Sequence, residues 1–160
     1  LLINGGGHKM AAGLTVDEAR VHELSEFLSA RLARSVDGSA DHDTLGLDGA
    51  LAVKGANRKL VDALERAGPY GSGNAEPRFA ITGARIVKSD EVGSGHVRCI
   101  LSGSDGGRLK AIAFRAADGP LGDSLLRPEG RTFHLAGHLR ADNWRGEKNV
   151  QFSVDDAALA

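Results

Sequence analysis

The second half of the sequence repeats one pattern, in which short alternating segments are separated by glycine-rich turns. The segments are RFAITGARIVKS (78–89), HVRCILSG (96–103), RLKAIAFRA (108–116), RTFHLAGHLRA (131–141) and NVQFSVDD (149–156). Alternation of apolar and polar residues is typical of β-strands with one buried face. Five such strands within about 80 residues predict a small closed β-barrel.

The five-stranded OB fold is the common barrel of this size, and it often carries a helix between its third and fourth strands. The separator at that place, ADGPLGDSLLRPEG (117–130), contains two prolines and three glycines, so any helix there should be short. Alternation predicts an inward set, which is Val97, Cys99, Leu101, Phe133, Leu135, Leu139, Val150, Phe152 and Val154. It predicts an outward set of Arg98, Lys110, His134, His138, Arg140 and Gln151.

The outward face and the neighbouring loops of an OB barrel are where a single nucleic-acid strand lies, with cations along its backbone and aromatic rings on its bases. Candidate cations are Arg98, Lys110, Arg140, Arg145 and Lys148. The only tryptophan, Trp144, lies in the turn DNWRGE and is the best candidate for stacking. The alternative, that Trp144 covers the barrel mouth, stays open.

The chain begins with a dense glycine segment, NGGGHKMAAG (4–13). We interpret it as a loop whose backbone N–H groups can converge on an anion, with His8 and Lys9 adding charge or hydrogen bonds. A flexible tail with incidental glycines is the alternative. Thr15 and Glu18 form a capping box for a helix over 17–34, and a strand over 44–53 and a helix from Asn57 to Gly68 follow.

This first part is a small α/β unit, and we expect it to be incomplete. The segment AGPYGSGNAEPRF (67–79) joins it to the barrel. A plain connector accounts for that composition better than a loop presenting Tyr70, Asn74 and Arg78 to a partner.

Composition excludes several function classes. With one cysteine, Cys99, the chain has no intrachain disulfide and no cysteine-based zinc site, and a net charge of −1 gives no global basic signature. No apolar run could span a bilayer and no leader is recognised, so we expect a cytoplasmic protein without membrane contact. His42 lies between two aspartates in a polar loop with no further ligand nearby, so no metal site is assigned to this chain. We identify no catalytic residue and no resident cofactor.

Three quoted segments carry a resemblance to a known family. GGGHKMAAGLT resembles the glycine-histidine signature of the DHHA1 domain in the DHH phosphoesterase superfamily. LERAGPYGSGNAEPRF is similar to the segment of RecJ single-strand-specific exonucleases that leads into their OB domain. LKAIAFRAAD and NWRGEKNVQFSVDD resemble the third strand and closing hairpin of that OB domain.

The resemblance implies an α+β chain, in which a partial α/β DHHA1 lobe (1–68) and a connector (69–78) precede a five-stranded OB barrel (79–160). It implies a parent enzyme that degrades single-stranded DNA from the 5′ end in DNA repair and recombination. The Mn²⁺ or Mg²⁺ ions of that enzyme are held by a DHH lobe absent from this chain, which we expect to be a C-terminal piece that is inactive alone.

The partners that the resemblance implies are single-stranded DNA and the DHH lobe of the same protein. The residues that it assigns to the terminal phosphate are Gly6, Gly7, His8, Ala11, Ala12 and Gly13, with Lys9 in register at a variable position. Two alternatives remain, a non-catalytic OB interaction module and a small-nucleotide phosphodiesterase. The barrel after Phe79 disfavours the phosphodiesterase, whereas the near-neutral charge mildly favours the interaction module.

Overall fold

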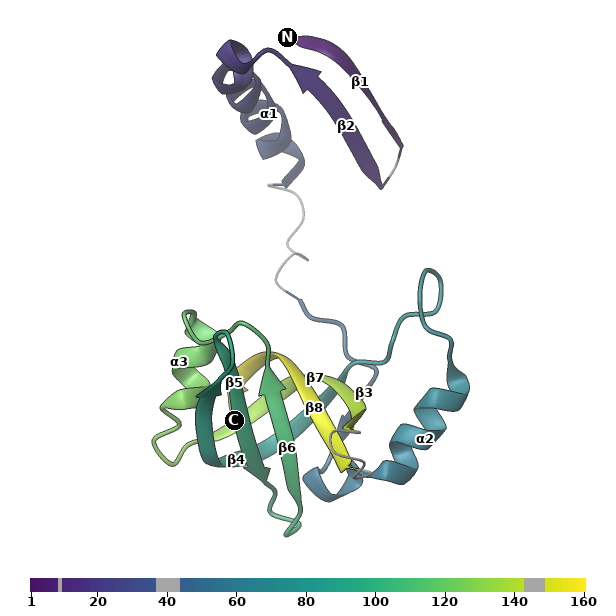
Figure 1. Cartoon of the computed structure of the whole chain (residues 1–160), viewed down its shortest axis with the longest axis vertical. Coiled ribbons are helices and arrows are strands. Elements are labelled where there is room, and N and C mark those ends of the chain that lie inside the picture. The colour runs from purple at the N-terminus through teal and green to yellow at the C-terminus, as the bar shows by residue number, and fades with distance from the viewer. Residues whose placement is uncertain (9, 37–43, 143–148) are drawn as a thin grey trace. The chain divides into compact units, whose positions relative to one another are not determined.

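The computed structural model describes residues 1–8, 10–36, 44–142 and 149–160, without the side chains of 34–36. These residues form two compact units, Leu1–Leu45 and Gly46–Ala160, which are described separately below (Figure 1).

The first unit begins with a β-hairpin. Strand β1 (Leu2–His8) pairs antiparallel with β2 (Ala11–Val16), so that Gly6 lies opposite Gly13 and Gly7 opposite Ala12. The prediction that these glycines form a loop is therefore wrong, because they are part of a strand. A Cβ on Gly7 would lie 2.7 Å from the Ala12 Cβ, so this close pairing requires glycine at position 7.

The predicted helix is confirmed but its cap is not the predicted one. A 3-10 turn, η1 (Glu18–Arg20), leads into α1 (Val21–Val36). The cap is Asp17, whose Oδ1 accepts a hydrogen bond from the Ala19 N–H at 3.0 Å. Thr15 is instead the partner of Asn4 in the hairpin, so it lies too early in the chain to cap this turn.

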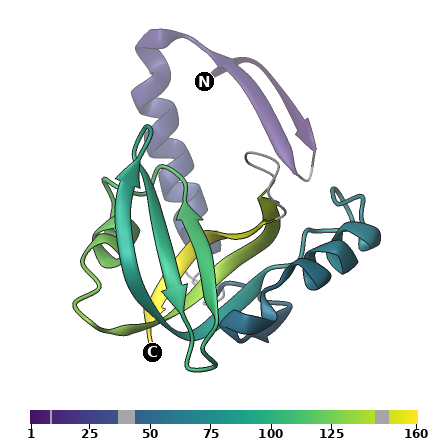
Figure 2. The same ribbon diagram turned by 60° about the horizontal axis from the view of Figure 1, so that its bottom comes forward.

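The second unit is a closed barrel. Its strands are β4 (Phe79–Val92), β5 (His96–Ser102), β6 (Arg108–Ala113), β7 (Thr132–Asp142) and β8 (Asn149–Leu159). They follow the order β4-β5-β6-β8-β7, and the pairing of β4 with β7 closes the barrel (Figure 2). The predicted short helix is α3 (Pro120–Leu126), which contacts β4, β5 and β8. This is the arrangement expected of an OB fold.

The barrel core confirms the predicted alternation. Every member of the inward set is buried except Val150, which is half-buried and packs against the core. Burial raises the pKa of the Cys99 thiol to about 12, so Cys99 is a core residue and an unreactive thiol.

Three elements before the barrel pack onto it. They are β3 (Gly49–Leu51), which pairs parallel with β4, the 3-10 turn η2 (Val53–Gly55) and α2 (Arg58–Ala67). Val53 and Val61 are buried in the barrel core. The strand predicted over 44–53 is thus only three residues long. The division predicted after residue 68 also differs from the boundary between compact units, which lies after Leu45.

Two predicted features of this region are confirmed. Asn57 caps α2 by accepting a hydrogen bond from the Leu60 N–H at 3.1 Å, and α2 ends before Gly68.

The turn between β5 and β6 is joined to η2 by Asp105, whose carboxylate accepts hydrogen bonds from the backbone N–H groups of Lys54 (2.7 Å) and Gly107 (2.8 Å).

Candidate nucleic-acid interface

The strand register lines up the outward residues of the barrel in rows that cross several strands. One row runs from Lys88 on β4 through Ile100, Lys110 and Gln151 to Arg140 on β7. A second row contains Asp90, Arg98, Ile112, Ser153 and His138. The structure therefore places the predicted cations Arg98, Lys110 and Arg140 on one continuous face.

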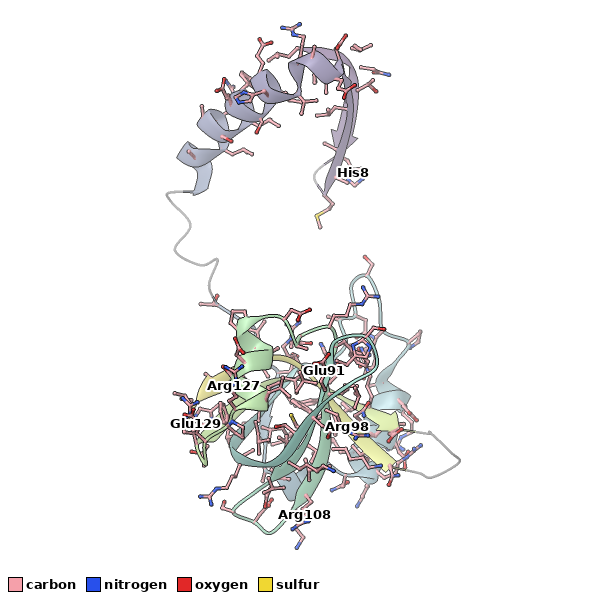
Figure 3. The ribbon with its side chains drawn as sticks, turned by 60° about the vertical axis from the view of Figure 1, so that its left-hand side comes forward. His8, Glu91, Arg98, Arg108, Arg127 and Glu129 are labelled. Atoms are coloured by element: carbon pink, nitrogen blue, oxygen red, sulfur yellow. The ribbon has the colours of Figure 1, made fainter. Side chains whose placement is uncertain are left out.

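Further cations lie on the same face and were missed in the sequence. Arg85 and Arg108 are both partners of Ser102 in the ladder, and Lys88 is the partner of Ile100. Arg85 and Arg108 each stand next to a buried residue of their strand, Ile86 and Leu109, and therefore point outward. This alternation is the signal in the sequence that could have identified them. Figure 3 shows Arg98 and Arg108 projecting from this unit.

The three described cations that were predicted from the sequence are each paired with a carboxylate. Arg98 contacts Asp90, the Lys110 Nζ lies 3.6 Å from the Asp142 Oδ2, and Arg140 donates through Nε to Glu76 at 2.8 Å. By contrast, the side chains of Arg85, Lys88 and Arg108 make no ion pair with any residue that the structure describes. Counted over the described residues, the face combines six cations with three paired carboxylates, so this part is locally positive on a chain of net charge −1.

The face is also hollowed. Ile100, Arg108, Lys110 and Asn149 line a depression of about 440 Å³ over β5, β6 and β8. An open depression with cations at its edge suits an extended charged polymer better than a small enclosed ligand.

The segment between α2 and the barrel is bonded internally. The Tyr70 hydroxyl donates to the Leu64 carbonyl at 2.7 Å, and the Asn74 amide donates to the Pro69 carbonyl at 2.9 Å. Arg78 donates through Nε to Asp155 at 2.8 Å. Because all three side chains already have partners in this unit, the geometry favours a connector over a presenting loop.

The hairpin of the first unit offers a different kind of surface. Gly6 and Gly13 face each other, and a Cβ on either would meet nothing within 4 Å. With Asn4, Gly5, Leu14 and Thr15 they line a hollow of about 340 Å³. Exposed His8 lies next to the turn of this hairpin (Figure 3), and its Nδ1 accepts a hydrogen bond from the Met10 N–H at 3.2 Å.

Several predicted residues lie outside the described part of the chain, namely Lys9, Trp144, Arg145 and Lys148. Within residues 1–8, 10–36, 44–142 and 149–160, no group of three or more His, Cys, Asp or Glu side chains could hold a metal ion. None of the helices among these residues is both long and apolar enough to cross a membrane.

The chain is similar to RecJ proteins along nearly its whole length. It is 30% identical over 158 residues to the single-stranded-DNA-specific exonuclease RecJ of Dickeya dadantii, covering 97% of this chain and 26% of that protein. It is 32% identical over 157 residues to the RecJ of Thermus thermophilus, covering 98% of this chain and 21% of that protein. The chain therefore spans about a quarter of the length of these relatives.

A solved structure agrees with these relatives. The crystal structure of Thermus thermophilus RecJ in complex with Mn²⁺ matches with a TM-score of 0.69 and 28% identity, over 99% of this chain and 22% of that chain. The family model of the RecJ OB domain matches residues 47–156, which run from the segment before β3 into β8. Because this match covers well over half of the sequence, the chain belongs to the RecJ OB domain family.

Proposed function

We propose that the barrel unit binds a single DNA strand across the outer face of β5 and β6. The observation that carries this proposal is the set of rows in which Arg85, Lys88, Arg98, Arg108, Lys110 and Arg140 share one face. In OB folds the second and third strands, here β5 and β6, form the usual surface for oligonucleotides. When the strand binds, its phosphates replace the present carboxylate partners of Arg98, Lys110 and Arg140, which are Asp90, Asp142 and Glu76.

The parent protein is proposed to be a 5′-to-3′ single-stranded-DNA exonuclease of DNA repair and recombination, located in the cytoplasm. Matching RecJ structures contain Mn²⁺ or Mg²⁺. The residues described here do not fit such an ion, because they include no suitable group of His, Cys, Asp or Glu ligands. We propose that the DHH lobe cleaves the bond and that this chain binds the strand.

The hairpin is proposed to belong to a DHHA1 lobe and to hold the terminal phosphate. Open space beside Gly6 and Gly13 supports this proposal, because the hairpin itself does not require glycine at either position. In a strand at a sheet edge, alternate N–H groups point away from the partner strand, so β1 has donors to offer an anion. His8 adds an imidazole next to this strand.

Fluorescence anisotropy with a labelled single-stranded oligothymidylate tests the barrel proposal. Binding should weaken as the salt concentration rises. The logarithm of the association constant, plotted against the logarithm of the salt concentration, should have a slope of about −0.7 for each phosphate contacted. Replacing Arg108 by alanine should reduce the magnitude of the slope by about 0.7.

The matched control is Arg127→Ala, since Arg127 lies beside α3, away from Arg98 and Arg108 (Figure 3). It should leave the slope unchanged. Binding that is absent, or that does not respond to salt, would favour a non-catalytic OB interaction module instead.

A further inference from the structure

Phe114 directly follows β6 and is exposed to solvent. Arg108, Lys110 and Ile112 point outward from β6, and Phe114 continues that alternation. Its side chain is 56% exposed, which is unusual for a large aromatic residue on a well-packed barrel. The sequence pattern did not identify it, because a single phenylalanine at the end of a strand reads equally well as core.

Among the residues that the structure describes, the ring that Phe114 contacts is that of His96. The pairing of Val97 with Ala113 puts His96, the first residue of β5, across from Phe114. Their ring centroids are 5.3 Å apart with an interplanar angle of 75°, which is an edge-to-face arrangement. This places two aromatic rings together at one end of the cationic face.

The local backbone holds this ring pair in place. The Arg115 N–H donates to the His96 Nδ1 at 2.9 Å, and the Ala117 N–H donates to the Gly95 carbonyl at 3.1 Å. Arg115 also has a φ of +54°, a strained value for a residue other than glycine. Backbone strain of this kind is retained where surrounding contacts fix it, often at binding sites.

Charges around the ring pair match a nucleic-acid strand. Arg98 is two residues beyond His96 on the same outward face, and Arg115 follows Phe114 directly. Within the described residues, the Arg115 guanidinium makes no ion pair. An exposed ring with Arg115 next to it in the chain and Arg98 on the neighbouring strand suits a nucleotide, because its base can stack while its phosphates meet Arg115 and displace Asp90 from Arg98.

We propose that Phe114, held against His96, is a platform on which an unpaired nucleobase of the bound strand stacks. This inference rests on the proposed function of the same face as a single-strand interface. It assigns the recognition of bases to one end of that face, while the rows of cations contact phosphates. Stacking tolerates any base, because every base has a π-face, so the platform adds affinity without sequence preference.

The test compares two probes of equal length, a single-stranded oligothymidylate and an oligonucleotide of abasic sites, using the whole 160-residue chain. The wild-type chain should bind the oligothymidylate more tightly. Phe114→Ala should weaken binding of the oligothymidylate about fivefold or more while leaving the abasic probe and the salt slope unchanged. Phe114→Tyr keeps a ring and should behave like the wild type, whereas Phe114→Leu should resemble the alanine variant.

Leu159→Ala is the matched control. Leu159 is 57% exposed and pairs with Phe133 at the far end of β8, so its removal should change neither probe. Circular dichroism spectra should show each variant folded, because Phe114 contributes little to the core.

The experiment distinguishes failure of the Phe114 platform from failure of the proposed function. If Phe114→Ala binds both probes as the wild type does, and the salt slope persists, the platform is refuted and the strand-binding face stands. If the wild-type chain binds neither probe, the proposed function fails and the platform fails with it.

Discussion

Arg140 on β7 donates a hydrogen bond of 2.8 Å to the carboxylate of Glu76, which lies 64 residues earlier in the connector. This pair fastens the connector to the barrel and at the same time neutralises one cation of the proposed DNA face. Hydrogen bonding to Arg140 lowers the pKa of Glu76, and the same contact raises the pKa of Arg140. Both groups are therefore charged at neutral pH, and a DNA phosphate must compete with Glu76.

Replacing Glu76 by glutamine should strengthen binding of single-stranded DNA. The change frees the Arg140 guanidinium for phosphate, and partly exposed pairs of this kind are worth up to about 1 kcal/mol, or about fivefold in affinity. Anisotropy at low salt measures the effect. Glu129→Gln is the control, since it makes the same charge change beside Arg131, and Glu129 lies away from Arg98 and Arg108 (Figure 3). Weaker binding by Glu76→Gln would show that Arg140 does not contact DNA.

Stability should fall in acid, in part through Glu76 and Asp105. The pKa of Asp105 is lowered by hydrogen bonds from the backbone N–H groups of Lys54 and Gly107. A carboxyl group with a lowered folded-state pKa binds more protons when unfolded, so its stabilising contribution is complete above the unfolded value. That contribution is lost as the pH falls below the ordinary values of 4.5 for Glu76 and 3.8 for Asp105, through the lower folded values.

Urea unfolding across this acidic range checks the contribution of the two carboxylates. The double variant Glu76→Gln, Asp105→Asn should be less stable than the wild type at neutral pH, and the difference should shrink toward pH 3. A difference that is constant with pH would mean that neither carboxylate couples folding to protonation.

Alanine substitutions in the hairpin of the first unit should distinguish a glycine needed for folding from glycines needed for function. Alanine at Gly7 would clash with Ala12, so it should disrupt the hairpin. Alanine at Gly6 or Gly13 meets open space and should leave the hairpin intact. In a full-length protein carrying this chain, Gly6→Ala should nevertheless reduce exonuclease turnover by obstructing the phosphate. Normal turnover in a folded Gly6→Ala protein would remove the phosphate role from this strand.

Gly137 should be essential to the pairing of β7 with β8. It lies at the irregularity where the β7–β8 register shifts, and a Cβ there would clash with the Ser153 carbonyl oxygen. Gly137→Ala should destabilise the chain by roughly 1–3 kcal/mol, as overpacking does. Gly55→Ala, where a Cβ meets nothing within 4 Å, is the control and should change stability by less than about 0.5 kcal/mol. Equal stability of the two variants would contradict this description of the β7–β8 pairing.

The barrel could be predicted from the sequence because its signal is local. Alternation alone identified Val97, Cys99 and Leu101 as inward and Arg98 as outward. The packing of α2 on the barrel could not be predicted, since it depends on Val61 meeting residues far away in the chain. The hairpin was missed because glycine has a low strand propensity, and only its pairing with Ala11–Val16 shows the strand.

For the interface, residue types were predictable but their partners were not. Nothing near Arg140 in the sequence indicates Glu76, and nothing near Phe114 indicates His96. Both relationships arise from the strand register and the path of the connector, which are set by long-range pairing.

DNA is proposed to lie on the outer face of β5 and β6, and amide chemical shifts test this placement most directly. A ¹⁵N-labelled chain titrated with a single-stranded oligothymidylate should show its largest shift changes at Arg98, Ile100, Lys110 and Ile112, with α3 unaffected. Shift changes confined to α3 and the segment around Glu129, or none at all, would contradict the account.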